Sequence, residues 1–331
     1  MIIKILLVIA GFIGFMLVLN LFLIIVGLIG SVIPIKEKPY KGPKNPLIKT
    51  DGKAVVAAHR SGALIAPENT LMAFQACAES KEFDVELFEF DLRRTKDGKL
   101  IVVHDKTLDR TTNACEHFGE TDVFVENKTY DEIRQLNLGE NYMDKDGNYP
   151  YRGLRGDDIP DNLRAVDVEE IFDYLESKKK YLYSIDIKNS GELGRIAADE
   201  FHDILKKRGM LDQVIQATFH YEISKYVDKT HPDLTRGACR LEFFLMYIAA
   251  SFNLPLKKEW IKFNVLQVPA NQYVIVRPAS KRFVTYAHNL GIAVQYWTIN
   301  EEKEIRRLNS IGADCIMSDL PDLCYKVIKG E

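Results

Sequence analysis

The most apolar part of the chain is its N-terminus, where residues 5–35 carry no charged side chain. The run exceeds the roughly 20 residues that a membrane-spanning helix needs, and it is longer than the apolar core of a cleaved signal peptide. We therefore expect residues 1–35 to form an uncleaved, single-pass transmembrane anchor. The alternatives are a signal peptide cleaved near Gly30 and Ser31, and a buried helix of a soluble protein.

Beyond this region, short apolar runs alternate with longer amphipathic stretches. Nine runs have the length and composition of strands: 54–58, 87–95, 100–104, 181–188, 214–219, 235–241, 265–269, 293–299 and 315–318. The stretches that favour helices include 70–79, 168–178, 195–207, 279–289 and 301–310. Strands that alternate with helices of this length predict a parallel sheet.

Nine strands are one too many for an eight-stranded barrel, and the hairpin signal Asp97-Gly98 explains the surplus. A dipeptide of this type between two strand-like runs favours a tight turn, which makes residues 100–104 the return arm of a hairpin. The other eight runs can close an α/β fold, the (β/α)₈ TIM barrel, over residues 53–329.

Charge and cysteine usage narrow the class of protein. The formal net charge of −3 gives no reason to expect nucleic acid as a partner, and no feature indicates a protein partner. The five cysteines lack the C-x-x-C spacing of a zinc site. The apolar run is followed by Lys36, Lys38, Lys41 and Lys44. They lie in the segment 36–52, which we interpret as a juxtamembrane linker. The positive-inside rule then places the C-terminal domain in the cytoplasm.

Carboxylates mark the candidate chemistry. Glu89 and Asp91 lie two residues apart in one predicted strand, so their side chains share a face. Burying both inside a barrel is unfavourable unless a cation compensates them, and hard oxygen ligands suit one Mg²⁺ or Ca²⁺ ion. Asp186, in the strand 181–188, could complete the set. Lys188 shares the face of Asp186 and could meet an anionic phosphate.

Two histidines fall near the same end of the predicted sheet. His59 and Arg60 follow the first strand. With Asp97-Gly98 as a two-residue turn, Asp91 faces His104, and directly paired Cβ atoms lie about 5 Å apart. Each of these residues alone could be structural or part of a solvated face. Their joint occurrence at the C-terminal ends of successive strands, where barrel active sites gather, indicates one site.

Several motifs extend this pattern over about residues 54–322. They are His59-Arg60, Pro67-Glu68-Asn69-Thr70, Glu89-x-Asp91, His104-Asp105, Leu108-Asp109-Arg110-Thr111, Asp186-Ile187-Lys188, Trp297-Thr298-Ile299-Asn300 and Gly312 to Asp319. Together they resemble the glycerophosphodiester phosphodiesterase family. The resemblance implies a (β/α)₈ barrel of the phosphatidylinositol-phosphodiesterase-like type with a small insertion.

The resemblance also assigns roles to residues. It implies that His59 and His104 are the catalytic acid/base pair, that Glu89, Asp91 and Asp186 hold the metal, and that Arg60 and Lys188 bind phosphate, with Glu68, Asn69 and Trp297 in support. His104 could touch the metal as well. Two departures from the family pattern matter. Ser61 stands where the family usually has glycine, so the first loop could differ. Asp186 replaces the usual glutamate, as in the sphingomyelinase D group, which leaves the head group open.

The expected activity is metal-dependent hydrolysis of glycerophosphodiesters to glycerol 3-phosphate, or lysophosphatidate, plus an alcohol. One histidine would deprotonate the nucleophile and the other would protonate the leaving alcohol. The nucleophile could be water or a neighbouring glycerol hydroxyl. One alternative is lysophospholipase D or sphingomyelinase D-like activity on membrane lipids. A catalytically silent, membrane-bound scaffold barrel is the non-enzymatic alternative.

A second apolar segment, residues 243–256, resembles one found in the anchored, lysophospholipase D-like members of the family. It is either an ordinary barrel helix or an element that dips into lipid beside the active site. In the second case we expect it at the rim that carries His59 and His104. Phe244, Met246 and Tyr247 are then the side chains expected to enter the lipid.

Overall fold

The computed structural model describes residues 2–270 and 277–330. Eight parallel strands form the centre: β1 (Val55–Ala58), β2 (Leu87–Arg94), β4 (Leu182–Ile187), β5 (Val214–Ala217), β6 (Thr235–Arg236), β7 (Val265–Pro269), β8 (Ala293–Trp297) and β9 (Cys315–Ser318). Their order is β6-β5-β4-β2-β1-β9-β8-β7. A parallel bridge between Gly237 and Val265 joins the two ends of this order. The predicted (β/α)₈ barrel is therefore confirmed.

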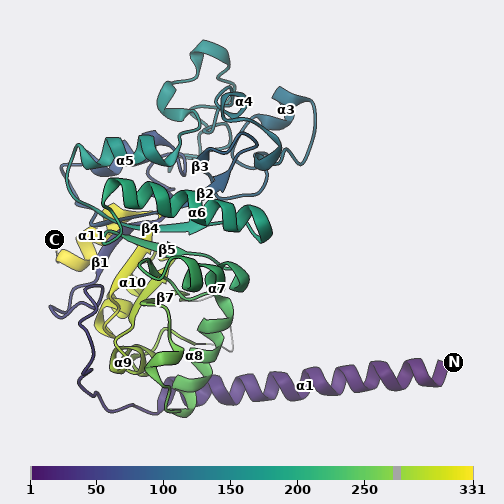
Figure 1. Cartoon of the computed structure of the whole chain (residues 1–331), viewed down its shortest axis with the longest axis vertical. Coiled ribbons are helices and arrows are strands. Elements are labelled where there is room, and N and C mark those ends of the chain that lie inside the picture. The colour runs from purple at the N-terminus through teal and green to yellow at the C-terminus, as the bar shows by residue number, and fades with distance from the viewer. Residues whose placement is uncertain (1, 271–276, 331) are drawn as a thin grey trace.

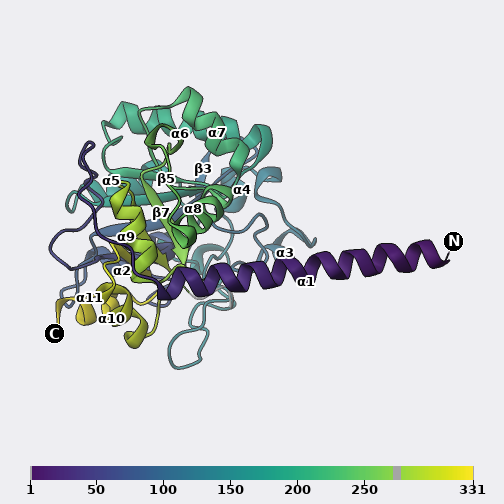
Figure 2. The same ribbon diagram turned by 90° about the horizontal axis from the view of Figure 1, so that it is seen from below.

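The barrel helices cover the outside of the strands (Figures 1 and 2). They are α2 (Leu71–Ala78), α5 (Val168–Glu176), α6 (Gly191–Arg208), α7 (Tyr221–Thr230), α8 (Arg240–Phe252), α9 (Lys281–Asn289), α10 (Glu302–Ser310) and α11 (Pro321–Lys329). The strand predicted over 235–241 is wrong in its second half, because Arg240 and Leu241 already belong to α8. The Glu242 carboxylate accepts a hydrogen bond from the Cys239 backbone N–H, which favours a helix start there over a longer strand.

The hairpin is present, but its predicted register is wrong by one residue. β3 (Leu100–Val102) pairs antiparallel with β2, and Arg94 faces Leu100. The turn holds three residues, since the Thr95 N–H donates to the Lys99 carbonyl at 2.9 Å. Gly98 takes the left-handed conformation that this longer turn needs, at φ 89°. Asp91 therefore faces Val103, whose N–H donates to the Asp91 carbonyl at 3.0 Å, and His104 lies one residue further along.

An insertion between β3 and α5 packs beside the barrel (Figure 1). It contains α3 (Ala114–Phe118) and α4 (Tyr130–Ile133). A separate apolar cluster holds it together, in which Leu108, Ile133 and Leu136 are fully buried. The insertion starts directly after His104, so it continues from one wall of the pocket described below.

The N-terminal helix α1 (Ile2–Val32) projects away from the barrel (Figures 1 and 2). Its stretch Leu7–Leu28 is long and apolar enough to cross a membrane. The following segment lies against the barrel. Asn45 Nδ2 donates to the carbonyls of Asn264 and Gly291 at 2.8 and 3.0 Å, just before β7 and just before β8. The segment 36–52 thus crosses the N-terminal end of the barrel.

Candidate active site

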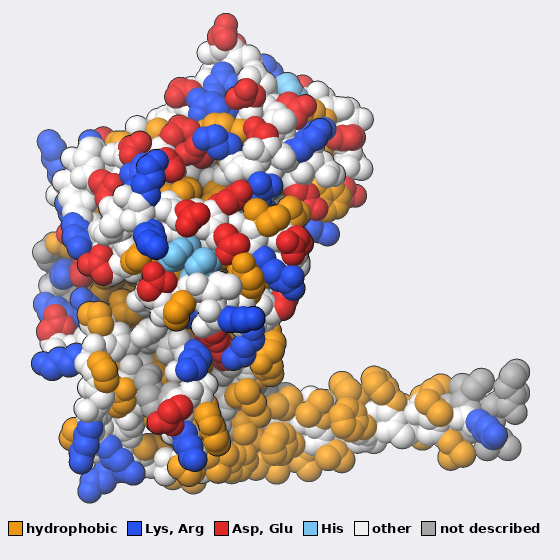
Figure 3. All heavy atoms as spheres, in the orientation of Figure 1, with side chains coloured by type: hydrophobic (Ala, Val, Ile, Leu, Met, Phe, Trp, Pro, Cys, Tyr) orange, Lys and Arg blue, Asp and Glu red, His pale blue; other side chains and the backbone are white. Residues whose placement is uncertain are grey.

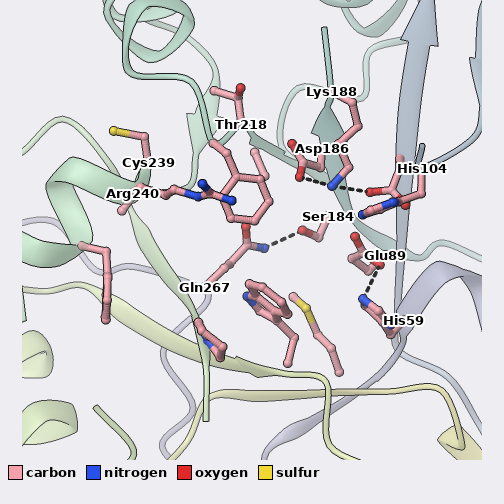
Figure 4. A pocket seen from close by; sticks show the side chains of 18 of the residues that line it. His59, Glu89, His104, Ser184, Asp186, Lys188, Thr218, Cys239, Arg240 and Gln267 are labelled. Atoms are coloured by element: carbon pink, nitrogen blue, oxygen red, sulfur yellow. Dashed lines mark hydrogen bonds and ion pairs between the residues drawn. The ribbon is translucent and has the colours of Figure 1, made fainter. Parts of the chain in front are cut away.

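A cavity of about 340 Å³ opens at the C-terminal ends of the strands (Figure 4). It brings together seven of the residues expected at the site from four segments of the chain: His59, Arg60, Glu89, Asp91, His104, Asp186 and Lys188. Trp297, at the end of β8, also lines it. The single cavity follows from topology, since parallel strands of a barrel end on one rim.

Two of the carboxylates are direct neighbours across the sheet. Asp91 of β2 pairs in register with Asp186 of β4. The Lys188 ammonium lies between them, 2.9 Å from Asp91 Oδ1 and 2.7 Å from Asp186 Oδ2. Its side chain is mostly buried, so the ion pairs are shielded from water. Asp186 Oδ1 is buried and has no hydrogen-bond partner in the described structure.

The surroundings of Glu89 and Asp91 shift the pKa values of these two carboxyl groups of β2 in opposite directions. Burial alone would raise the pKa of Asp91, but the nearby cations Lys188, His104 and Arg60 hold it well below its ordinary value. Burial and the negative charge of Asp91 raise the pKa of Glu89 to about 7. Glu89 is thus the carboxylate that the protein's own cations compensate least.

These donors fit a hard divalent cation. Glu89, Asp91 and Asp186 offer only oxygen atoms, and the unpaired Asp186 Oδ1 is the kind of buried acceptor that a cation would satisfy. In the part of the chain that the structure describes, no three His, Cys, Asp or Glu side chains are already gathered around one point. Lys188 accounts for this, because its ammonium ties up two of the three carboxylates.

His59 is oriented by a carboxylate on the strand-end loop after β9. Its Nδ1 lies 2.7 Å from Asp319 Oδ1, and Asn300 Nδ2 donates to the other oxygen of Asp319 at 2.8 Å. The Nε2 atom lies 3.9 Å from Glu89 Oε2. Burial opposes protonation of His59, but the Glu89 carboxylate and the Asp319 hydrogen bond outweigh it and raise the pKa of His59 above its ordinary value.

His104 is oriented in the same way from the other side of the cavity. Its Nδ1 lies 2.6 Å from Asp105 Oδ1. Arg110 bonds the second oxygen of Asp105 and also both oxygens of Glu68, at 3.0 and 2.6 Å. Each histidine therefore has one nitrogen fixed by an aspartate. Asp319, Asp105 and Arg110 were part of the sequence motifs but carried no assigned role, although a carboxylate next to a candidate histidine is itself a signal.

The first loop holds two of the carboxylates with one backbone donor and one side-chain donor. The Arg60 N–H donates to Glu89 Oε2 at 2.8 Å, and Asn69 Nδ2 donates to Asp91 Oδ2 at 3.1 Å. Arg60 and Ser61 both have positive φ, 46° and 67°. Ser61 thus takes the left-handed conformation that glycine adopts more easily. The loop forms despite the departure from the family's usual glycine.

Glu68 connects two arginines of the site. It accepts from Arg60 Nη1 at 3.1 Å as well as from Arg110. Glu68 therefore links Arg60 of the cavity to Arg110, and its supporting role stays a prediction.

The other half of the cavity is largely apolar and was not predicted in detail. Its walls include Phe219, Pro269, Trp297 and Met317. Arg240, the first residue of α8, lines this half and lies over the Phe219 ring at 4.7 Å from the ring centroid (Figure 4). In the described structure no carboxylate forms an ion pair with Arg240, so its positive charge in this half of the cavity is not neutralised by one.

The second apolar segment lies at the predicted rim. Phe243 and Phe244 of α8 line the same cavity as His59 and His104. Phe244 is 36% exposed. Met246 and Tyr247, however, are both 2% exposed, so the expectation that they enter lipid is wrong. They face the barrel because residues three and four positions after Phe243 share its side of the helix.

Comparisons with known proteins identify the family of the chain. The model of the glycerophosphoryl diester phosphodiesterase family matches residues 59–323. A glycerophosphodiester phosphodiesterase of Bacillus subtilis is 27% identical over 95% of this chain and 98% of its own. A mouse protein named lysophospholipase D GDPD3 is 24% identical over 80% of this chain and 79% of its own.

Solved structures show the same fold. A glycerophosphoryl diester phosphodiesterase of Silicibacter pomeroyi superposes with a TM-score of 0.65 at 20% identity, over 86% of this chain and 96% of its own. An Oleispira antarctica phosphodiesterase, solved with the product sn-glycerol-3-phosphate, superposes with a TM-score of 0.63 at 18% identity, over 84% and 98%.

Proposed function

The chain belongs to the glycerophosphoryl diester phosphodiesterase family of phosphoric diester hydrolases, and from this premise we propose that it hydrolyses glycerophosphodiesters to glycerol 3-phosphate and an alcohol. One observation carries the proposal for this site. Two histidines, each oriented by an aspartate, face one set of buried carboxylates across a single cavity.

His59 and His104 act as the acid/base pair in this proposal. Asp319 and Asp105 each bond the Nδ1 atom of one histidine, at 2.7 and 2.6 Å, so Nε2 is the atom that exchanges a proton with the substrate. One histidine removes a proton from the attacking hydroxyl, and the other gives a proton to the alcohol oxygen as its bond to phosphorus breaks. The proton count is balanced over one turnover.

Cationic side chains bind the phosphodiester. Arg60 and Lys188 line the cavity beside the carboxylates, and the Lys188 ammonium is held in place by Asp91 and Asp186. Positive charges placed before the reaction lower the barrier, since negative charge grows on the phosphoryl oxygens.

We propose that Glu89, Asp91 and Asp186 hold one divalent cation, Mg²⁺ or Ca²⁺. When bound, such an ion stabilises the charge on the phosphoryl oxygens. The raised pKa of Glu89, about 7, indicates that this carboxylate has most to gain from an added cation.

A second candidate activity is lysophospholipase D, with lysophosphatidate as a product. It is favoured by Phe243 and Phe244, which give the cavity an apolar wall suited to an acyl chain. The helix α1 would keep the enzyme at its substrate as a membrane anchor, with the barrel on the cytoplasmic side as the flanking lysines suggest.

The test is a product assay on the full chain in detergent micelles, with glycerophosphocholine and lysophosphatidylcholine as separate substrates. We expect release of choline, loss of activity with EDTA, and recovery with Mg²⁺ or Ca²⁺. His104→Gln should abolish turnover. His202→Gln is the matched control, because His202 also bonds an aspartate, Asp233, but lies on α6 outside the cavity. Equal activity of the two variants would contradict the proposal.

A further inference from the structure

The helix α1 is part of the folded barrel domain, and we infer that this attachment turns the mouth of the cavity toward the lipid bilayer. The partner surface that we assign is a membrane lipid surface. It meets the outer face of α8 and the loop that follows it. The inference rests on the proposed function only in its last step, the delivery of substrate from the bilayer to the cavity.

Arg282, near the start of α9, makes the polar attachment. It is 7% exposed, and its guanidinium donates to the carbonyls of Ala250 and Ser251 at 3.0 and 2.9 Å. It also donates to the carbonyl of Ile33, which directly follows α1. These carbonyls belong to the end of α8 and the end of α1, where helix carbonyls lack partners within the helix. One buried cation therefore fixes both helix ends.

Apolar packing supports the same attachment. The Phe22 ring of α1 stacks on Phe252 of α8 at a centroid distance of 6.3 Å. Val26 is fully buried and belongs to the same apolar core cluster as Phe243 and Phe283. A helix that served as a loose tether would need neither contact. The C-terminal turns of α1 instead pack as a further layer on the barrel helices.

The path of the chain after α1 indicates which end of the barrel lies on the side of the membrane. The Lys38 N–H donates to Asn289 Oδ1 at the last residue of α9, and Asn45 then bonds the carbonyls that precede β7 and β8. The chain thus runs from α1 to the N-terminal end of the barrel. The helix α1 projects the other way, on the side where the insertion and the C-terminal ends of the strands lie (Figures 1 and 2).

The surface next to α1 has the composition of a membrane contact. On α8, Leu241, Leu245 and Phe252 are 46%, 57% and 40% exposed. Figure 3 shows apolar side chains continuing from α1 onto the adjoining edge of the barrel. An exposed apolar surface that continues from a helix of this kind is typical of a membrane contact.

The consequence is a route for a single-chain phospholipid. Its acyl chain would stay beside the exposed face of α8 while its phosphodiester passes Phe244 to reach Glu89 and Lys188. The substrate would never need to leave the membrane for water. A small diester would reach the same cavity from solution.

The position of the surface can be measured with a tryptophan placed on the exposed face of α8. The chain has two tryptophans, Trp260 and Trp297, so Leu245→Trp is combined with Trp260→Phe and Trp297→Phe to leave one fluorophore. The full chain is reconstituted in vesicles of phosphatidylcholine brominated on the acyl chains, and we expect quenching of the introduced indole compared with unbrominated vesicles. Unquenched emission would overturn the inference.

The role of Arg282 is tested by Arg282→Met, with Arg306→Met as the control, since Arg306 is exposed on α10 and, within residues 2–270 and 277–330, pairs with its helix neighbour Glu302. We expect Arg282→Met to lower turnover of lysophosphatidylcholine in vesicles about tenfold, while turnover of glycerophosphocholine stays unchanged. Equal losses on both substrates would overturn the assignment of Arg282.

A second variant avoids any doubt about folding. Leu245→Gln changes an exposed side chain, so the barrel should stay intact, and the same selective loss is expected. If the unmodified chain hydrolyses neither substrate, the proposed function fails. Quenching of the indole introduced in place of Leu245 would still decide whether this face meets the bilayer.

Discussion

The most direct test of the acid/base assignment is Asp319→Asn, which changes the environment of His59 without touching the cavity wall. The carboxylate of Asp319 serves two donors, His59 Nδ1 at 2.7 Å and Asn300 Nδ2 at 2.8 Å. An amide offers one oxygen instead of two. One of the two donors must then lose its acceptor or face an NH₂ group, so the fixed orientation of His59 is lost.

The size of the effect follows from the bond that is removed. A hydrogen bond between charged groups contributes about 1.5–3 kcal/mol, and the Asp319 side chain is only 18% exposed, so screening by water is weak. At about 1.4 kcal/mol per unit, the pKa of His59 should fall by about one to two units. Loss of correct general acid–base catalysis should lower kcat by about 10²- to 10⁴-fold.

The direction of the pH effect is fixed by the direction of the shift. Glu89 and Asp319 together raise the pKa of His59 above its ordinary value. Removing the Asp319 charge lowers it, whether His59 acts as the base or the acid. The limb of the pH–rate profile that belongs to His59 should therefore move to lower pH.

The assay is kcat for glycerophosphocholine as a function of pH, with Asp233→Asn as the control. Asp233 bonds His202 at 3.1 Å outside the cavity, so the same chemical change there should leave kcat unchanged. If Asp319→Asn keeps nearly full kcat and its pH profile does not move, His59 does not transfer a proton in the reaction.

Four further predictions concern the metal, the fold, the head group and the first loop. Glu89→Gln should lower turnover about 100-fold or more without changing the melting temperature, as should EDTA on the unmodified chain. Arg236→Met should destabilise the fold by about 1.5–3 kcal/mol in thermal unfolding, because Asp228 and Glu242, both mostly buried, lose the cation that pairs with them; a loss below about 1 kcal/mol would contradict this. Arg240→Ala should reduce the preference for anionic over cationic head groups in paired turnover assays, since it removes the cation over Phe219. Ser61→Gly should stabilise the protein by about 1 kcal/mol in denaturant unfolding, because it relieves a positive φ and a buried hydroxyl without a partner.

The barrel was predictable from the sequence because each of its strands and helices is recognised from residues that are close together in the chain. Each strand is a short apolar run, and each gap has the length of a crossover helix. β7 and β9 were predicted with their observed bounds. The failure at 235–241 is instructive, since Leu241 and Phe243 suit a strand or a helix equally well. Glu242 favours the helix, because its carboxylate accepts a hydrogen bond from the Cys239 N–H at the start of α8 and also bonds Arg236.

The residues of the cavity were predictable for a different reason. Residues at the C-terminal ends of parallel strands must meet on one rim, so Glu89, Asp91 and Asp186 could be placed together without knowing any contact. The cross-strand partner of His104 was harder to predict, because it depends on the exact number of residues in one turn. Thr95 shifts that count by one through its hydrogen bonds to Lys99. His104 still reaches the cavity, because the chain leaves β3 after Val102.

What the sequence could not supply are contacts between segments that are far apart in the chain. Arg282 lies within a helix that the sequence predicts, but the carbonyl of Ile33 to which it donates is 249 residues away in the chain. An arginine on a helix is usually solvated, and only its burial against three carbonyls shows that it connects two helix ends. An apolar N-terminus alone therefore predicts a membrane helix but not its angle to the barrel. That angle decides whether the cavity faces lipid or water, and it depends on Arg282 and the packing of Val26.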